Sequence, residues 1–188
     1  AATGRFGARY VSSRASFAIA GHAALDAFAE HGQHCDAVLL ACFGDPGLDA
    51  LREVAGIPVI SLIDASCAEA AAGGRRFSIV TGGERWHAML TEMIAARGLG
   101  SQLASIRTVA PTGGDIARDP EGSAALLAAT CRACANEDKA EAVILGGAGL
   151  IGIAEMIQPG LDVAVICSNA AGFRATAQAL ARKAPRQA

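Results

Sequence analysis

The residue best suited to carry chemistry is Cys42, which stands between an apolar run and a polar turn. The run 36–42 ends at this cysteine, and the turn 43–46 follows it directly. Pro46 fits the first turn of a helix, where its missing N–H costs nothing. Free N–H groups at a helix start favour a thiolate, so we expect a pKa below the usual value of about 8.5. The alternative is a structural cysteine that packs as a small hydrophobe.

An internal similarity places a second segment opposite this cysteine. Residues 36–44 (DAVLLACFG) align without gaps with residues 141–149 (EAVILGGAG), which brings Cys42 to the position of Gly147. A short helix and another apolar strand are expected after each copy. Ligands bind outside the carboxyl ends of parallel strands, so the two turns are expected to flank one site. Chance similarity between two buried strands is the alternative.

The elements that would position these turns alternate along the chain. Apolar runs rich in Val, Ile and Leu, without in/out alternation, indicate parallel strands buried on both faces. A cluster of polar residues formed by Asp115, Arg118 and Asp119 is expected to be a solvated loop. The predicted strands are 36–42, 57–63, 77–81, 103–109, 141–146 and 161–167, and the predicted helices are 19–31, 46–54, 65–72, 83–97, 120–136, 150–156 and 170–183.

This order predicts an α/β fold of two pseudo-symmetric lobes with parallel sheets and the active site between the lobes. Lobe one is expected to comprise residues 1–75 and 160–188, and lobe two residues 76–159. No stretch of the chain has the composition of a linker.

Composition narrows the class of partner. The net charge is −2 and aromatic residues make up 4% of the chain, which argues against a nucleic-acid partner. No apolar run approaches the roughly 18 residues of a membrane span. The six cysteines do not follow a secreted pattern, so reduced thiols in a cytoplasmic protein are expected. The expected partners are a small-molecule substrate and other copies of the chain in a homo-oligomer.

Two further motifs resemble a dinucleotide site and a zinc site but lack the sequence context that such sites need. Residues 147–152 match G-x-G-x-x-G, but the next strand ends without the carboxylate that a dinucleotide site needs. Cys131 and Cys134 have C-x-x-C spacing within a helical pattern that lacks a zinc-knuckle turn. Neither of the two lysines lies where a Schiff base with pyridoxal phosphate would be credible. We therefore expect no metal and no cofactor.

Residues 41–50 (ACFGDPGLDA) resemble the first active-site motif of hydantoin and allantoin racemases. Residues 142–149 resemble their second motif, and 77–81 resembles a strand that ends in a substrate-facing threonine. From about residue 5 to residue 181, the chain thus resembles the aspartate/glutamate and hydantoin racemase superfamily. The resemblance implies cofactor-independent proton transfer by two cysteines at a carbon beside a carbonyl.

In that mechanism one thiolate removes the proton, the other thiol delivers a proton to the opposite face, and nearby donors hold the oxyanion. Thr81 could instead cap the helix expected near Gly83. The resemblance implies that Cys42 is catalytic and that the substrate-binding positions are Phe43, Gly44, Asp45, Thr81, Gly146, Gly147, Ala148 and Gly149.

The sequence departs from the family pattern in two places. Gly147 stands where two-cysteine members carry the second thiol, and the usual N-terminal strand–helix unit with its Asn-Pro-Asn turn is missing before Arg5. The leading hypothesis is a racemase or epimerase of hydantoin-like or amino-acid-derived substrates, with Cys167, water or His87 as second donor. The alternatives are a single-thiol decarboxylase of the arylmalonate type, whose thiol corresponds to Gly147, and a non-catalytic ligand-binding relative.

Overall fold

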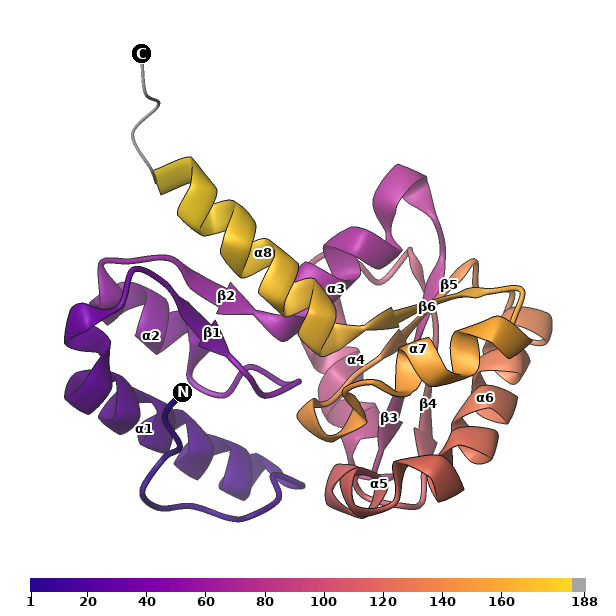
Figure 1. Ribbon diagram of the computed structural model, residues 1–188, viewed down its shortest axis with the longest axis horizontal. Helices are drawn as coiled ribbons and strands as arrows, with labels where there is room; N and C mark the ends of the chain where they lie inside the picture. Colours follow the sequence, from indigo (N-terminus) through magenta and orange to yellow (C-terminus); the bar gives the residue numbers. More distant parts are fainter. Residues whose placement is uncertain (184–188) are drawn as a thin grey trace.

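The computed structural model describes residues 1–183 and contains two parallel sheets (Figure 1). All strand pairs within residues 1–183 are parallel, as expected for an α/β fold with crossover helices. The predicted fold class is therefore confirmed. The smaller sheet pairs β1 (Val38–Leu40) with β2 (Val59–Ser61), and the larger has the order β4 (Leu103–Val109), β3 (Phe77–Gly82), β5 (Ala142–Leu145) and β6 (Ala164–Cys167).

The helices follow the predicted pattern with one addition. Helix α1 begins earlier than predicted because Ser13 and Ser16 form a capping box at its start. Helix α5 replaces the predicted solvated loop, because Thr112 and Asp115 form a second capping box there. The helices are α1 (Arg14–His31), α2 (Leu48–Ala55), α3 (Leu62–Ala70), α4 (Trp86–Ala96), α5 (Gly113–Arg118), α6 (Pro120–Asn136), α7 (Ile153–Ile157) and α8 (Ser168–Lys183).

The larger sheet forms the centre of the core. Every residue of β3 and β5 is buried, which explains why their sequences are apolar on both faces. Side chains from α6 and α7 pack on one face, where Leu127 and Leu145 are fully buried. Side chains from α3 and α4 pack on the other face, where Phe77 and Leu90 are fully buried.

The chain crosses between the two sheets near its end, and this differs from the predicted division into lobes. Strand β6 pairs with β5 in the larger sheet, although the prediction assigned 160–188 to lobe one. Helix α8 then leaves that sheet, packs against α3 and reaches β1 and β2 (Figure 1). Residues 184–188 of the predicted lobe one lie outside the described residues.

Candidate active site

The turn that carries Cys42 begins directly after β1. The strand ends early because the Cys42 N–H donates to the Leu40 carbonyl at 2.9 Å, and the Asp45 N–H donates to the Cys42 carbonyl at the same distance. Helix α2 begins only at Leu48, after Gly47 in the left-handed conformation. The sequence predicted that Cys42 lies at a helix N-terminus, and this prediction is wrong.

The electrostatic environment of Cys42 is also the opposite of the prediction. Burial, together with the nearby Asp45 carboxylate, raises the pKa of the Cys42 thiol to about 11. The expected lowering of this pKa is wrong, because desolvation and a like charge both oppose the thiolate and no helix start compensates for them. Both effects favour the neutral thiol of Cys42 over the thiolate.

The second turn, residues 146–149, lies against the first. The Gly146 N–H donates to the Val80 carbonyl at 2.9 Å, which fixes the turn to the end of β3. Phe43, only 4% exposed, packs its ring so closely on Gly146 that a side chain there would overlap it. The residue after Cys42 therefore contacts the residue before Gly147, and the two turns meet as predicted.

Gly147 has a conformation that few other residues adopt. Its φ is +141°, and an added Cβ would lie 3.2 Å from Leu150 Cδ1 and 3.9 Å from Thr81 Oγ1. Its N–H donates to Ser168 Oγ at 3.2 Å, and its carbonyl accepts from Asn169 Nδ2 at 3.0 Å. The backbone of this turn is thus held by the start of α8.

Ser168 and Asn169 are residues that the sequence analysis did not select. Both are buried and follow β6 directly. Polar residues at the carboxyl end of a parallel strand are a signal for a site, and this signal was available in the sequence. Their bonds to Gly147 could not be predicted, because α8 reaches that turn only through the three-dimensional path of the chain.

Thr81 lies near the end of β3, next to the 146–149 turn. It is buried, and its hydroxyl donates to the Gly146 carbonyl at 2.6 Å. Helix α4 begins at Trp86 with Arg85 at its N-cap, so the alternative role of Thr81 as a helix cap is wrong. Thr81 joins the end of β3 to the 146–149 turn beside Gly147.

The remaining predicted positions have different surroundings. An added side chain at Gly44 would meet the Trp86 ring, and one at Gly149 would overlap the Gly113 carbonyl. Ala148 is exposed. The close approach of backbone to backbone or to an aromatic ring explains why both glycines are needed here.

The two suggested substitutes for the second thiol occupy less favourable positions. Cys167 is 4% exposed and pairs in register with Leu145 inside the larger sheet. His87 is exposed on α4. Cys167 belongs to β6 and His87 to α4, so neither residue is part of the 146–149 turn, where the second thiol was expected.

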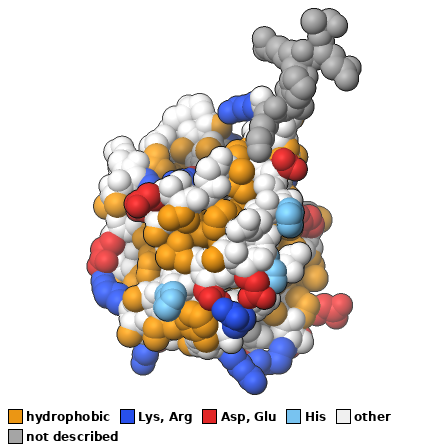
Figure 2. Space-filling view, turned by 90° about the vertical axis from the view of Figure 1, so that its left-hand side faces the viewer, with side chains coloured by type: hydrophobic (Ala, Val, Ile, Leu, Met, Phe, Trp, Pro, Cys, Tyr) orange, Lys and Arg blue, Asp and Glu red, His pale blue; other side chains and the backbone are white. Residues whose placement is uncertain are grey.

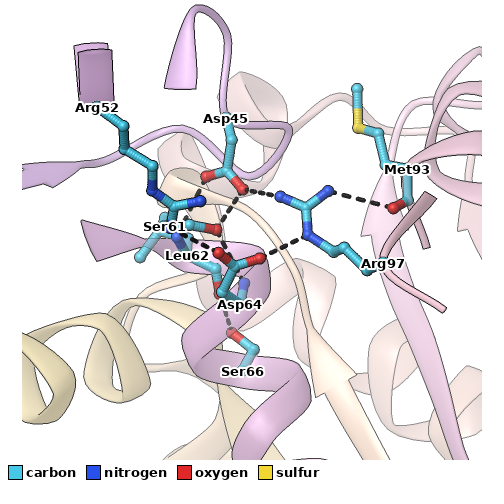
Figure 3. Close-up of polar contacts among 8 residues, drawn as sticks. All are labelled: Asp45, Arg52, Ser61, Leu62, Asp64, Ser66, Met93 and Arg97. Carbon is cyan, nitrogen blue, oxygen red and sulfur yellow. Dashed lines mark hydrogen bonds and ion pairs between the residues drawn. The ribbon is translucent and has the colours of Figure 1, made fainter. Parts of the chain in front are cut away.

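Asp45 is placed in a buried ion-pair network (Figure 3). Its side chain is 2% exposed and accepts hydrogen bonds from Ser61 Oγ, from the Leu62 N–H at 3.2 Å and from Arg97 Nη2 at 2.9 Å. Burial raises the pKa of this carboxyl to about 6, against the lowering effect of its hydrogen bonds and of Arg97. The Asp45 carboxylate therefore binds protein groups, in contrast to the other residues of the turn.

A cavity of about 710 Å³ reaches Cys42, but neither Thr81 nor any residue of the 146–149 turn lines it. It is lined by the N-terminal segment 2–11, by α1 and by residues 35–42, including Cys42. Figure 2 shows the face of the molecule that lies on the left in Figure 1, where hydrophobic side chains gather in the middle and charged ones lie mostly around them. A volume of this size is in the range of small-molecule sites.

Two absences within residues 1–183 are relevant. No group of three or more His, Cys, Asp or Glu side chains in this range is arranged to hold a metal ion. Over the same part of the chain, no helix is both long enough and apolar enough to span a membrane.

The fold is that of a known class of racemases. An allantoin racemase from Pseudomonas fluorescens superposes with a TM-score of 0.89 and 27% identity over 97% of this chain and 77% of its own. A glutamate racemase from Bacillus anthracis, at 18% identity and a TM-score of 0.67 over 92% of this chain and 67% of its own, shows the fold alone.

The sequence comparisons identify the family. The family model of Asp/Glu/hydantoin racemases matches residues 1–176. A hydantoin racemase from Pseudomonas sp. (strain NS671) is 37% identical over 139 residues, which cover 74% of this chain and 56% of that protein. The chain belongs to the Asp/Glu/hydantoin racemase family, and it spans a little over half the length of this curated relative.

Proposed function

We propose that the protein is a cofactor-independent racemase or epimerase that moves a proton at an acidic carbon of a hydantoin-like or amino-acid-derived substrate. Family membership supports the reaction class. The observation that carries the proposal is the contact between the two turns, in which Phe43 of the Cys42 turn packs on Gly146. This contact supports a site in which the Cys42 thiol would act on one side and the backbone of the 146–149 turn and Thr81 would line the other.

The proposed chemistry uses one sulfur. The thiolate form of Cys42, a minor species at neutral pH because the pKa is raised, removes the proton from the carbon beside a carbonyl, which leaves an enolate and a neutral thiol. The N–H groups of Phe43, Gly44, Ala148 and Gly149 are the proposed donors to the enolate oxygen, with Thr81 beside them. Return of the proton from Cys42 to the same face regenerates the substrate, and a proton delivered to the opposite face gives the other enantiomer.

Water is the proposed donor on the opposite face. Gly147 has no titratable group, Cys167 is buried in the sheet and His87 is exposed on α4. Because water is a weak acid, exchange of the proton is expected to be faster than inversion. The ratio of the two rates is therefore the diagnostic property of a single-thiol member of this family.

The test incubates one enantiomer of a 5-substituted hydantoin with the protein in deuterium oxide. NMR measures deuterium incorporation at the acidic carbon, and polarimetry measures inversion. The expected result is incorporation faster than inversion, with both abolished in Cys42→Ser and unchanged in the matched control Cys134→Ser. Cys134 is a free thiol on α6 that does not line the cavity around Cys42, so it controls for nonspecific effects of removing sulfur. Absence of incorporation in the wild type, or its persistence in Cys42→Ser, contradicts the proposal.

The single sulfur favours a second candidate function, the decarboxylation of a malonate-like substrate. Here the C–C bond to one carboxylate breaks, carbon dioxide leaves with no redox change, and the neutral thiol protonates the resulting enediolate. Release of carbon dioxide from an aryl malonate without hydantoin exchange would favour this function. A rise in melting temperature with either ligand and no turnover would instead indicate the non-catalytic relative.

A further inference from the structure

We propose that the Asp45–Arg97 ion pair is a positioning device for Cys42, which fixes the turn of the thiol and sets the local charge against which the thiol ionises. This inference rests on the proposed function and assigns it a positioning residue that does not touch the substrate. Three observations support it: the burial of Asp45, its place in the turn of Cys42, and the number of separate elements that its carboxylate connects.

Asp45 belongs to the Cys42 turn by its backbone and to the rest of the molecule by its side chain. Its N–H donates to the Cys42 carbonyl. Its carbonyl accepts from the N–H of Leu48, the first residue of α2, at 3.2 Å. Its φ of +53° is a left-handed conformation that is unusual for a residue other than glycine. Such a conformation persists only where the surroundings hold it in place.

The groups that hold Asp45 come from three other elements, β2, α3 and the end of α4. Ser61 and Leu62 lie at the junction of β2 and α3, and Arg97 follows the end of α4, which packs on the larger sheet. Figure 3 shows the Arg97 guanidinium between the carboxylates of Asp45 and Asp64. The Cys42 turn is thus tied through one carboxylate to the side of the molecule that also carries the 146–149 turn.

The network around Asp45 balances its positive and negative charges. Arg97 Nε bonds Asp64 at 2.5 Å, and Arg52 from α2 bonds the same carboxylate at 2.7 Å. Cys67 on α3 is a second buried thiol near Asp45, Asp64 and Arg97. Two arginines thus face two carboxylates, and a change at Asp45 or Arg97 leaves one unit of charge beside the turn.

Removing the carboxylate or the guanidinium should therefore have opposite effects on Cys42. Asp45→Asn keeps the size and the acceptor for Ser61 but removes a negative charge, so the thiol should ionise at a lower pH. Arg97→Gln removes the positive charge that compensates Asp45, so the thiol should ionise at a higher pH. A nearby charge typically shifts such a pKa by about one unit or more.

The experiment measures the rate of alkylation of Cys42 by iodoacetamide against pH, followed by mass spectrometry of its peptide. The expected result is a midpoint about one pH unit lower in Asp45→Asn and higher in Arg97→Gln than in the wild type. Because alkylation needs no turnover, the result does not depend on whether the protein racemises hydantoins. A failed exchange assay would overturn the proposed function, whereas an unchanged alkylation midpoint would overturn the present inference.

Asp138 provides a matched control. It also bonds a serine and an arginine, Ser105 Oγ at 2.6 Å and Arg107 Nε at 2.6 Å, in a network distinct from that of Asp45. Asp138→Asn is expected to leave the Cys42 midpoint unchanged. Equal shifts in Asp138→Asn and Asp45→Asn, or shifts of the same sign in Asp45→Asn and Arg97→Gln, would show a general loss of structure and would overturn the inference.

Discussion

Restoring a thiol at position 147 should increase racemisation at a measurable cost in stability. The replacement Gly147→Cys places a side chain at φ +141°, where L-residues are strained. This strain costs about 1–3 kcal/mol. The new Cβ would be 3.2 Å from Leu150 Cδ1, so Leu150 must move by a few tenths of an ångström, whereas the 3.9 Å to Thr81 Oγ1 is an ordinary contact. For a chain of this size the melting temperature should fall by roughly 2–12 °C.

The Gly147→Cys protein is expected to stay folded and to invert a hydantoin faster than the wild type. A positioned acid or base contributes about 10²–10⁴ in rate, so inversion of a hydantoin should rise by that factor. Gly147→Ala has the same backbone strain without sulfur, and Gly152→Cys places a thiol at another positive φ of +82° with no atom within 4 Å of its Cβ. Both controls should lose stability and gain no activity.

Circular dichroism measures the melting temperatures, and polarimetry of one hydantoin enantiomer measures inversion. A folded Gly147→Cys protein that inverts no faster than Gly147→Ala would refute the idea that the two turns face one substrate. An equal gain in Gly152→Cys would refute it as well, because the location of the added thiol would then make no difference.

Three further predictions test the structure around the site. Thr81→Val removes the 2.6 Å bond to the Gly146 carbonyl and should lower the free energy of unfolding by about 1–3 kcal/mol, seen in urea titrations, together with the exchange rate. Phe43→Ala empties the contact on Gly146 and should cost about 3–5 kcal/mol, whereas Phe173→Ala, 59% exposed, should change stability by less than about 0.5 kcal/mol. The pKa of Asp45 is raised from 3.8 to about 6, so the folded state holds this proton more tightly than the unfolded state. The free energy of unfolding should therefore fall as the pH rises from about 4 to about 6, and urea titrations should show a smaller fall in Asp45→Asn; an equal fall would contradict the assignment.

The two turns illustrate how far a sequence can predict a site. The repeat of 36–44 at 141–149 predicted both turns, and the burial of β3 and β5 follows from their apolar composition. The contact of Phe43 with Gly146 agrees with the predicted meeting of the turns. The strands before the two turns, β1 and β5, lie in different sheets, so the repeat indicates where the turns are, whereas their contact depends on how the two sheets pack.

The protonation of Cys42 shows where such reasoning fails. The Pro46 signal placed a helix start next to the thiol, but α2 begins at Leu48 and the buried Asp45 adds a like charge. A pKa depends on all charges and on the degree of burial within several ångströms, and these come from distant parts of the chain. Arg97, Ser61 and Asp45 are far apart in sequence and meet only after folding.

By itself, the sequence determined the alternation of strands and helices, the parallel α/β class, the two glycine-rich turns and the presence of one thiol where the repeat has a glycine. These properties depend on residues that are neighbours along the chain. Only the tertiary structure decided that β6 joins the larger sheet, that Ser168 and Asn169 hold Gly147, and that Asp45 turns into a buried ion pair. Such features depend on which distant groups share a small volume, and that is set by the packing of the whole core.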